Sequence, residues 1–77
     1  MADNDSIKRR IEKDIELFKK NVALVKGSEK NFTRMLELSK MYAKDSESYL
    51  ERGDLYTSFS CISYAHGLLD ALRELKN

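Results

Sequence analysis

Apolar residues recur at helical spacing along most of the chain. In the first third they follow one another at steps of three and four, which places them on one helix face. They are Ile7, Ile11, Ile15, Phe18, Val22 and Val25. This stripe predicts a helix over about residues 5–26, ended by a left-handed Gly27, with Ser28 capping the next helix. Leu17 and Leu24 lie about 90° from the stripe, so we expect a second contact surface there.

Two further amphipathic segments follow, over about residues 29–52 and 54–76. The second helix carries two adjoining stripes: Phe32, Leu36, Ser39, Ala43, Ser46 and Leu50, and beside them Met35, Leu38, Tyr42 and Tyr49. The small residues of the first stripe predict the close approach of a neighbouring helix. Gly53 ends this helix and Asp54 caps the third. The core side of the third helix comprises Leu55, Phe59, Ile62, Ala65, Leu69 and Leu72.

Turns of one to three residues force consecutive helices to lie antiparallel as neighbours. The sequence therefore predicts an all-α fold, an up-down-up three-helix bundle with two short Gly-containing turns. A chain of 77 residues has room for one small domain, so we expect a single three-helix domain over residues 1–77. At this size folding buries only ~60% of the surface that the unfolded chain exposes. No internal repeat is present.

Composition and charge narrow the function. The single Cys61 excludes an internal disulfide and suits a reducing cytosol, so we expect a cytoplasmic protein. No apolar run is long enough for a membrane span. A formal net charge of +1 gives no overall attraction to nucleic acid or anionic lipid. The basic residues Arg9, Arg10, Lys13 and Lys20 are interleaved with acidic ones, which is typical of a solvated helix face.

His66 and Asp70 form the strongest candidate for chemistry. They lie one turn apart on one helix face, and Asp14 lies level with His66 if the first and third helices are in register. Such a group is suited to a divalent metal or a proton carrier. A single histidine at the core margin more often only finds a hydrogen-bond partner, so the sequence predicts no catalytic residue, metal or cofactor.

Two surfaces are candidates for binding. Tyrosines with an apolar body and a polar tip often line binding surfaces, although they also serve as boundary residues of small bundles. Together with the pair above, the candidate ligand or partner surface comprises Tyr42, Asp45, Tyr49, Tyr56, His66 and Asp70. A second, self-associating strip on the outward flank of the third helix comprises Cys61, Leu68 and Leu75.

The last third of the chain also resembles known families. Tyr49-Leu50-Glu51-Arg52-Gly53-Asp54, followed by Tyr64-Ala65-His66-Gly67-Leu68-Leu69-Asp70-Ala71-Leu72, resembles the archaeal small-protein family catalogued as domain of unknown function 357. That resemblance implies a three-helix bundle in an archaeal, cytoplasmic protein, and implies no activity. The same segment looks like the hairpin of HEPN-type helical domains. Their nucleases need an Arg before the His, where this chain has Cys61, so nuclease activity does not carry over.

Two functions follow as expectations. The favoured one is a non-enzymatic module that binds a protein partner or a second copy of itself through apolar and tyrosine surface. The alternative is a small metal- or nucleotide-binding accessory protein centred on His66 and Asp70. They differ in a testable way, because only a ligand site requires Tyr42, Asp45, His66 and Asp70 to converge on one cavity.

Overall fold

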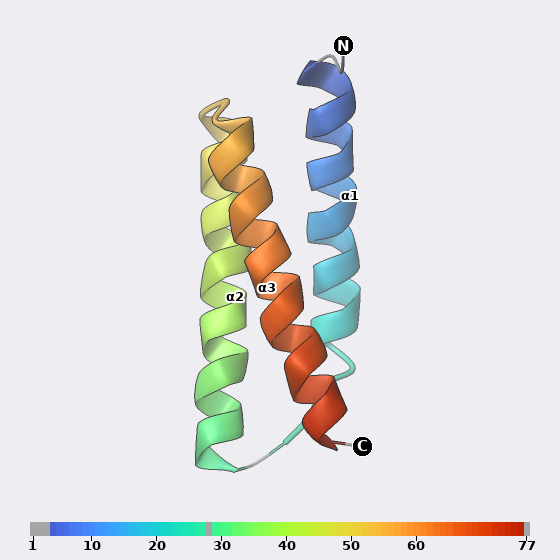
Figure 1. The fold of residues 1–77 in the computed structure, drawn as a ribbon, viewed down its shortest axis with the longest axis vertical. Helices are drawn as coiled ribbons and strands as arrows, with labels where there is room; N and C mark the ends of the chain where they lie inside the picture. Colours follow the sequence, from blue (N-terminus) through green and yellow to red (C-terminus); the bar gives the residue numbers. More distant parts are fainter. Residues whose placement is uncertain (1–3, 28, 77) are drawn as a thin grey trace.

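The computed structural model describes residues 4–27 and 29–76, and that part of the chain contains three α-helices and no strand. They are α1 (Asn4–Val22), α2 (Lys30–Glu51) and α3 (Leu55–Lys76). In the view of Figure 1 the helices run down, up and down, so that consecutive helices are antiparallel, in a rod of 43 × 19 × 16 Å. The predicted all-α three-helix bundle is confirmed.

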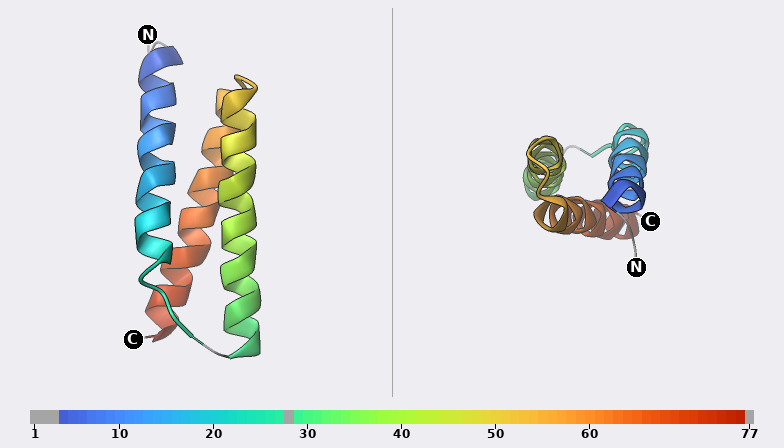
Figure 2. Two further views of the ribbon diagram at one scale, coloured as in Figure 1. Left: turned by 180° about the vertical axis from the view of Figure 1, so that it is seen from behind. Right: turned by 90° about the horizontal axis from the view of Figure 1, so that it is seen from above.

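Helix α3 is the shared partner of the other two. It runs obliquely, so that it starts beside the end of α2 and finishes beside the end of α1 (Figures 1 and 2). Helix α1 packs mainly on α3 and touches α2 little. The buried apolar core comprises Ile11, Ile15, Phe18, Ala43, Ile62, Ala65, Leu69 and Leu72. Half of these residues belong to α3, as expected of the helix that packs against both of the others.

The turn between α2 and α3 has the geometry that the sequence predicts. Gly53 adopts a φ of 82°, which only glycine tolerates readily. The backbone N–H of Gly53 donates to Leu50 O, and that of Asp54 donates to Tyr49 O, each at 3.0 Å. These two bonds form a Schellman motif, which satisfies the last carbonyls of α2. Asp54 Oδ1 then accepts the N–H of Thr57 at 3.1 Å and caps α3.

The connection between α1 and α2 differs from the prediction. Helix α1 ends at Val22 instead of continuing to about residue 26, and residues 23–29 form a longer connection. Two backbone bonds spanning three residues, from Leu24 N to Asn21 O and from Val25 N to Val22 O, close the last turn. Half-buried Val25 still packs against the core. The apolar pattern therefore outlasts the helix, because the connection itself covers the core.

Gly27 has a different role from the one predicted. Its φ is not positive, so it is not a left-handed helix stop. A Cβ on Gly27 would come within 2.6 Å of the Phe32 ring, so the glycine allows the chain to pass closely beneath that side chain. The predicted cap, Ser28, lies outside the described residues. Glu29 precedes α2 and makes no side-chain capping bond.

Three predicted contact residues are exposed. Leu17 is 49% exposed, because α1 packs through one face and needs no second one, and Leu24, in the connection after α1, is 77% exposed. Phe59, which was expected in the core, is 38% exposed at the rim between α1 and α3. The Arg10 guanidinium lies 5.7 Å from the centre of its ring, so Arg10 belongs to this contact and not to a fully solvated face.

The contact between α2 and α3 is built from small residues, as predicted. Ser39, Ala43 and Ser46 of α2 are buried, and so is Ser58 of α3. Ser46 Oγ donates to Ser58 O and Ser58 Oγ donates to Ser46 O, both at 2.7 Å. Each hydroxyl thus bonds the backbone of the opposite helix, which holds the two helices close together near the turn.

Candidate functional site

His66 lies between α3 and α1. Its Nε2 is 2.8 Å from the backbone carbonyl oxygen of Asp14, and because a carbonyl only accepts, Nε2 donates. The imidazole also meets the Phe18 ring edge-on, at 5.6 Å between ring centres. Asp14 is level with His66 as predicted, but it contributes its backbone and not its carboxylate. His66 therefore fastens α1 to α3.

Asp70 does not complete a site with His66. It is exposed, and no hydrogen bond joins the two side chains. Within residues 4–27 and 29–76, no group of three or more histidine, cysteine, aspartate or glutamate side chains is placed to hold a metal ion. No observation on these residues favours a function centred on His66 and Asp70.

Tyr42 makes its contact on the other side of α3. Its ring meets that of Tyr64 at 90° and 4.5 Å between centres. Tyr64 and His66 are two positions apart, and at about 100° per residue their side chains leave opposite sides of the helix. Tyr42 and His66 therefore do not converge on one cavity.

The structure instead brings together two stripes on the side of the α2–α3 hairpin that faces away from His66. The α2 stripe repeats at steps of three and four residues, the α3 stripe does so up to Leu68 with a last step of seven, and every member is half-buried or exposed. We call this surface the outer seam. It comprises Met35, Leu38, Tyr42, Asp45 and Tyr49 from α2, and Thr57, Cys61, Tyr64, Leu68 and Leu75 from α3.

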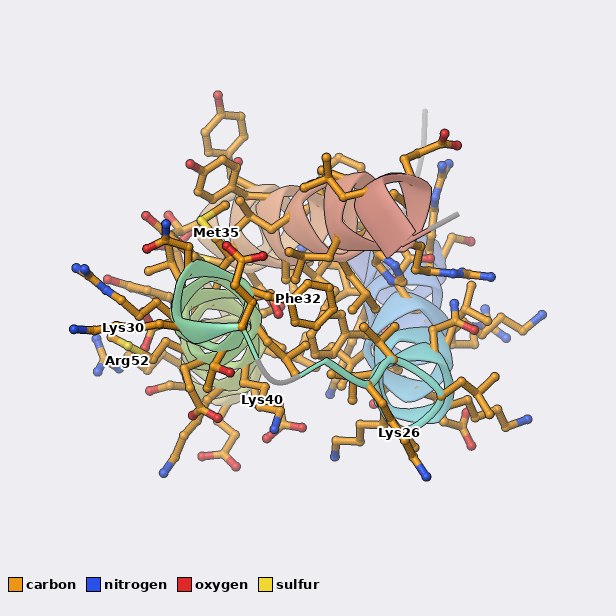
Figure 3. All side chains as sticks on the ribbon, turned by 90° about the horizontal axis from the view of Figure 1, so that it is seen from below. Lys26, Lys30, Phe32, Met35, Lys40 and Arg52 are labelled. Carbon is orange, nitrogen blue, oxygen red and sulfur yellow. The ribbon has the colours of Figure 1, made fainter. Side chains whose placement is uncertain are left out.

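The lower end of the outer seam opens into a hollow of about 640 Å³. There α2 and α3 have diverged from their turn, and Met35 and Leu75 of the seam share the lining with Phe32 and Leu72. Phe32 points from α2 toward α1, whereas Met35 lies nearer to α3 (Figure 3). Leu75 is 80% exposed. Gly27, Glu29 and Asn31 complete the lining, so the seam ends in a mainly apolar recess large enough for a side chain of a partner.

The middle of the outer seam is acidic. Among the described residues, Asp45 forms neither an ion pair nor a hydrogen bond, although it lies one turn from Tyr42 and one turn from Tyr49. Burial raises the pKa of the Cys61 thiol, and the charges of Asp45 and Asp54 raise it further. Cys61 is therefore a neutral packing residue at physiological pH and not an activated nucleophile.

Comparison with known protein families assigns the chain to one of them. The pattern of one family matches residues 9–77, which include all of α2 and α3. The chain belongs to the family described as Protein of unknown function (DUF357). A search of the curated proteins finds no match.

The matched region of this family member contains the whole outer seam. Within the described residues, none of the helices is both long and apolar enough to cross a membrane. The family description adds no activity to either candidate surface, so the function has to be argued from the seam itself.

The two predicted surfaces are redistributed by the fold. Cys61, Leu68 and Leu75 lie on the same seam as Tyr42, Asp45 and Tyr49. The sequence pattern predicts two separate surfaces for these two groups. Tyr56 is 84% exposed and precedes Thr57 by one position, so its side chain turns away from the seam. Met35 and Leu38 were not assigned to either surface, although their stripe with Tyr42 and Tyr49 was visible in the spacing.

Proposed function

We propose that this protein is a non-enzymatic interaction module that binds an amphipathic helix along the outer seam. The observation that carries the proposal is the pair of adjacent stripes on α2 and α3, which repeat at helical spacing over several turns. A helix presents its own apolar residues at the same steps, so it can lie along such a surface with its side chains between the two stripes.

The position of α1 supports this proposal. It covers one side of the α2–α3 hairpin through Ile11, Ile15 and Phe18, and the outer seam lies on the other side. A helix on the seam would occupy the place that the fourth helix takes in a four-helix bundle. The apolar side chains of Met35, Tyr64 and Leu75 are 37%, 50% and 80% exposed along it. Covering exposed apolar surface of this kind favours association.

Site-specific photo-crosslinking tests the proposal directly. A photoreactive phenylalanine derivative replaces Leu75 on the seam in one variant and Leu17 on α1 in the control, since both leucines are exposed. In cells that naturally express the chain, we expect irradiation to join the Leu75 position to one predominant protein. The Leu17 position should give no such product. Equal yields from both positions, or none from Leu75, would contradict the assignment of the seam.

Light scattering coupled to size exclusion then separates two kinds of partner. If the bound helix belongs to a second copy, the purified chain forms a dimer whose mass falls to that of a monomer in Leu75→Glu. If the partner is another protein, the purified chain stays monomeric over the concentration range, and the crosslinked product contains a different chain. Either result is compatible with a helix-binding seam.

We also propose that the module works in the cytoplasm. The reduced Cys61 thiol supports this location, because a free cysteine is retained most readily in a reducing compartment.

A further inference from the structure

We infer that the helix bound on the outer seam is basic at its middle, with an arginine or lysine placed against Asp45 and Tyr64 and apolar residues on either side. This inference rests on the proposed function and adds the chemistry of the partner. It follows from the one acidic residue of the seam, from the rings beside it, and from the recess at the lower end.

Asp45 sets the charge of the partner. Its carboxylate lies on the same face as Tyr42 and Tyr49, and within the described part of the chain it has no cationic partner. A purely apolar helix laid over the seam would remove water from this carboxylate without replacing its hydrogen bonds, which is unfavourable. A guanidinium or ammonium group in the same place supplies both the opposite charge and the hydrogen bonds.

The environment of Cys61 supports the same reading. Cys61 lies on α3, across the seam from Tyr42 and Asp45. Burial is the main cause of the raised pKa of its thiol, and the charges of Asp45 and Asp54 raise this pKa further. The negative potential of Asp45 therefore reaches α3 across the seam, and that of Asp54 reaches Cys61 from the start of α3 itself. A cationic side chain at this level experiences both carboxylates.

The tyrosine rings add a second attraction for a cation. Tyr64 is half exposed, and its ring is held perpendicular to that of Tyr42. Cations are attracted to the faces of such rings. The chain already uses this interaction at the upper end of the seam, where the Arg52 guanidinium lies 5.1 Å from the centre of the Tyr49 ring. Tyr64 offers an equivalent ring to the partner.

The recess sets the spacing of the partner sequence. Met35 lies ten residues before Asp45 on α2, which is about 15 Å at 1.5 Å per residue. A bound helix that places its cation against Asp45 therefore has a large apolar residue ten or eleven positions away to enter the recess lined by Met35, Leu72 and Leu75. Between them, an apolar residue seven positions from the cation meets Leu38 and Leu68.

A second copy of the chain fits this chemistry less well. A two-fold pairing of two outer seams about their middle brings one Asp45 carboxylate toward the other, and like charges at an interface oppose association. None of the ten seam residues is a lysine or arginine, and the arginines that flank the seam, Arg52 over Tyr49 and Arg34 beside Met35 and Leu38, lie at its two ends and not at the level of Asp45. The observations therefore favour a basic helix of another protein.

Three synthetic peptides test the inference. Each is a helix of about 24 residues with leucines at steps of three and four, one of them ten or eleven positions from the centre, and they differ only at one central position, which holds Arg, Gln or Glu. Titration of the isotopically labelled protein, followed by nuclear magnetic resonance, gives the affinity and the surface contacted. We expect the Arg peptide to bind at least about tenfold more tightly than the Glu peptide, with shifts at Tyr42, Cys61 and Tyr64.

Matched variants identify the residues responsible. In Asp45→Asn the Arg-to-Glu ratio should fall to about twofold or less, whereas Glu51→Gln should leave it unchanged. Glu51 is the suitable control because it is exposed and lies two residues beyond Tyr49, on the other side of α2. Tyr64→Leu should reduce the preference for Arg over Gln, and Tyr56→Leu should not.

The outcomes separate this inference from the proposed function. Equal binding of all three peptides to the seam, or an unchanged Arg-to-Glu ratio in Asp45→Asn, overturns the basic partner and leaves the helix-binding seam standing. Tighter binding of the Glu peptide does the same. Absence of binding by every peptide at about 1 mM overturns both.

Discussion

The two helix contacts of this bundle are built on different principles. Between α2 and α3, small buried residues let the backbones approach, and Ser46 and Ser58 exchange hydrogen bonds across the contact. Between α1 and α3, the contact depends on large side chains, among them Ile11, Ile15 and Phe18. The comparison teaches that the stability of the α2–α3 hairpin depends on keeping the side chains between the helices small. The stability of the α1 contact depends on how much apolar surface its large side chains bury.

The polar contacts follow the same division. Helix α1 reaches α2 through an exposed ion pair, Lys19 Nζ to Glu47 Oε1 at 2.7 Å, and exposed ion pairs contribute little to stability. Its one hydrogen bond to α3 in the described chain joins His66 to the Asp14 backbone. The α2–α3 turn is held by backbone bonds and a cap. Loss of α1 should therefore be the easier of the two separations.

Truncation of Phe18 should have the largest effect on stability. Phe18→Ala removes a buried ring and its contact with His66, so we expect a loss of about 3–5 kcal/mol in the free energy of unfolding. Leu17→Ala is the control, because Leu17 is half exposed and should cost less than about 1 kcal/mol. Urea unfolding followed by circular dichroism measures both. Similar losses in the two variants would mean that the α1 contact is not built on Phe18.

Enlargement of Ser46 should come next. Ser46→Leu forces a larger side chain between α2 and α3 and should destabilise the protein by about 1–3 kcal/mol. Ser46→Ala removes the contacts of this hydroxyl with Ser58 O and Ser58 Oγ and keeps the bond from Ser58 Oγ to Ser46 O, at a cost of about 1 kcal/mol. Exposed Ser63→Leu serves as the control for the change in residue type. If Ser46→Leu were no worse than Ser46→Ala, lack of space would not limit the hairpin.

Two glycines should respond with opposite signs. Gly53→Ala places a side chain at a φ of 82° and should cost about 1–2 kcal/mol. Gly67 lies within α3, and an added Cβ would meet no atom within 4 Å. Gly67→Ala should therefore stabilise the protein by about 0.5–1 kcal/mol. Thermal unfolding of both variants tests this, and a destabilising Gly67→Ala would reveal a constraint on α3 that the isolated chain does not explain.

The same division explains which features of the fold could be predicted. The hairpin depends on neighbours in sequence: Gly53 turns, Asp54 caps, and the serines lie at helical spacing, so all three were readable. The connection after α1 is shaped instead by packing, because Val25 packs against the core from outside the helix and Gly27 passes close to the Phe32 ring. Apolar periodicity does not distinguish a buried residue of a helix from a buried residue of a connection, so it extended α1 too far.

The candidate surface was readable in parts but not as a whole. The spacing grouped Tyr42 with Met35, Leu38 and Tyr49 on one stripe, and it placed Asp14 level with His66. Whether these contacts lie on one side of α3 or on opposite sides depends on how the helices are rotated, which single-helix patterns leave open. The rotation of α3 about its axis directs His66 toward α1 and places Cys61 and Leu68 on the same seam as Tyr42.

The smallest effect should come from the Asp54 cap as the pH falls. The side-chain and backbone hydrogen bonds of Thr57, together with the Arg52 charge, hold the pKa of the Asp54 carboxyl below its ordinary value. A lowered pKa in the folded state means that the charged cap contributes stability above about pH 4 and loses that contribution as the pH falls through the folded-state value.

Asp54→Asn keeps an oxygen that can accept the Thr57 N–H but removes the charge. Wild type and this variant should therefore differ most near neutral pH, with the wild type more stable, and their melting temperatures should converge as the pH falls below about 4 and through the lowered folded-state pKa. Asp54→Ala, which lacks the acceptor, should be less stable than Asp54→Asn at every pH. A constant gap between wild type and Asp54→Asn down to low pH would show that the cap acts through its hydrogen bonds alone. The turn would then owe its stability to local geometry rather than to charge, and α2 and α3 would stay joined in acid as firmly as at neutral pH.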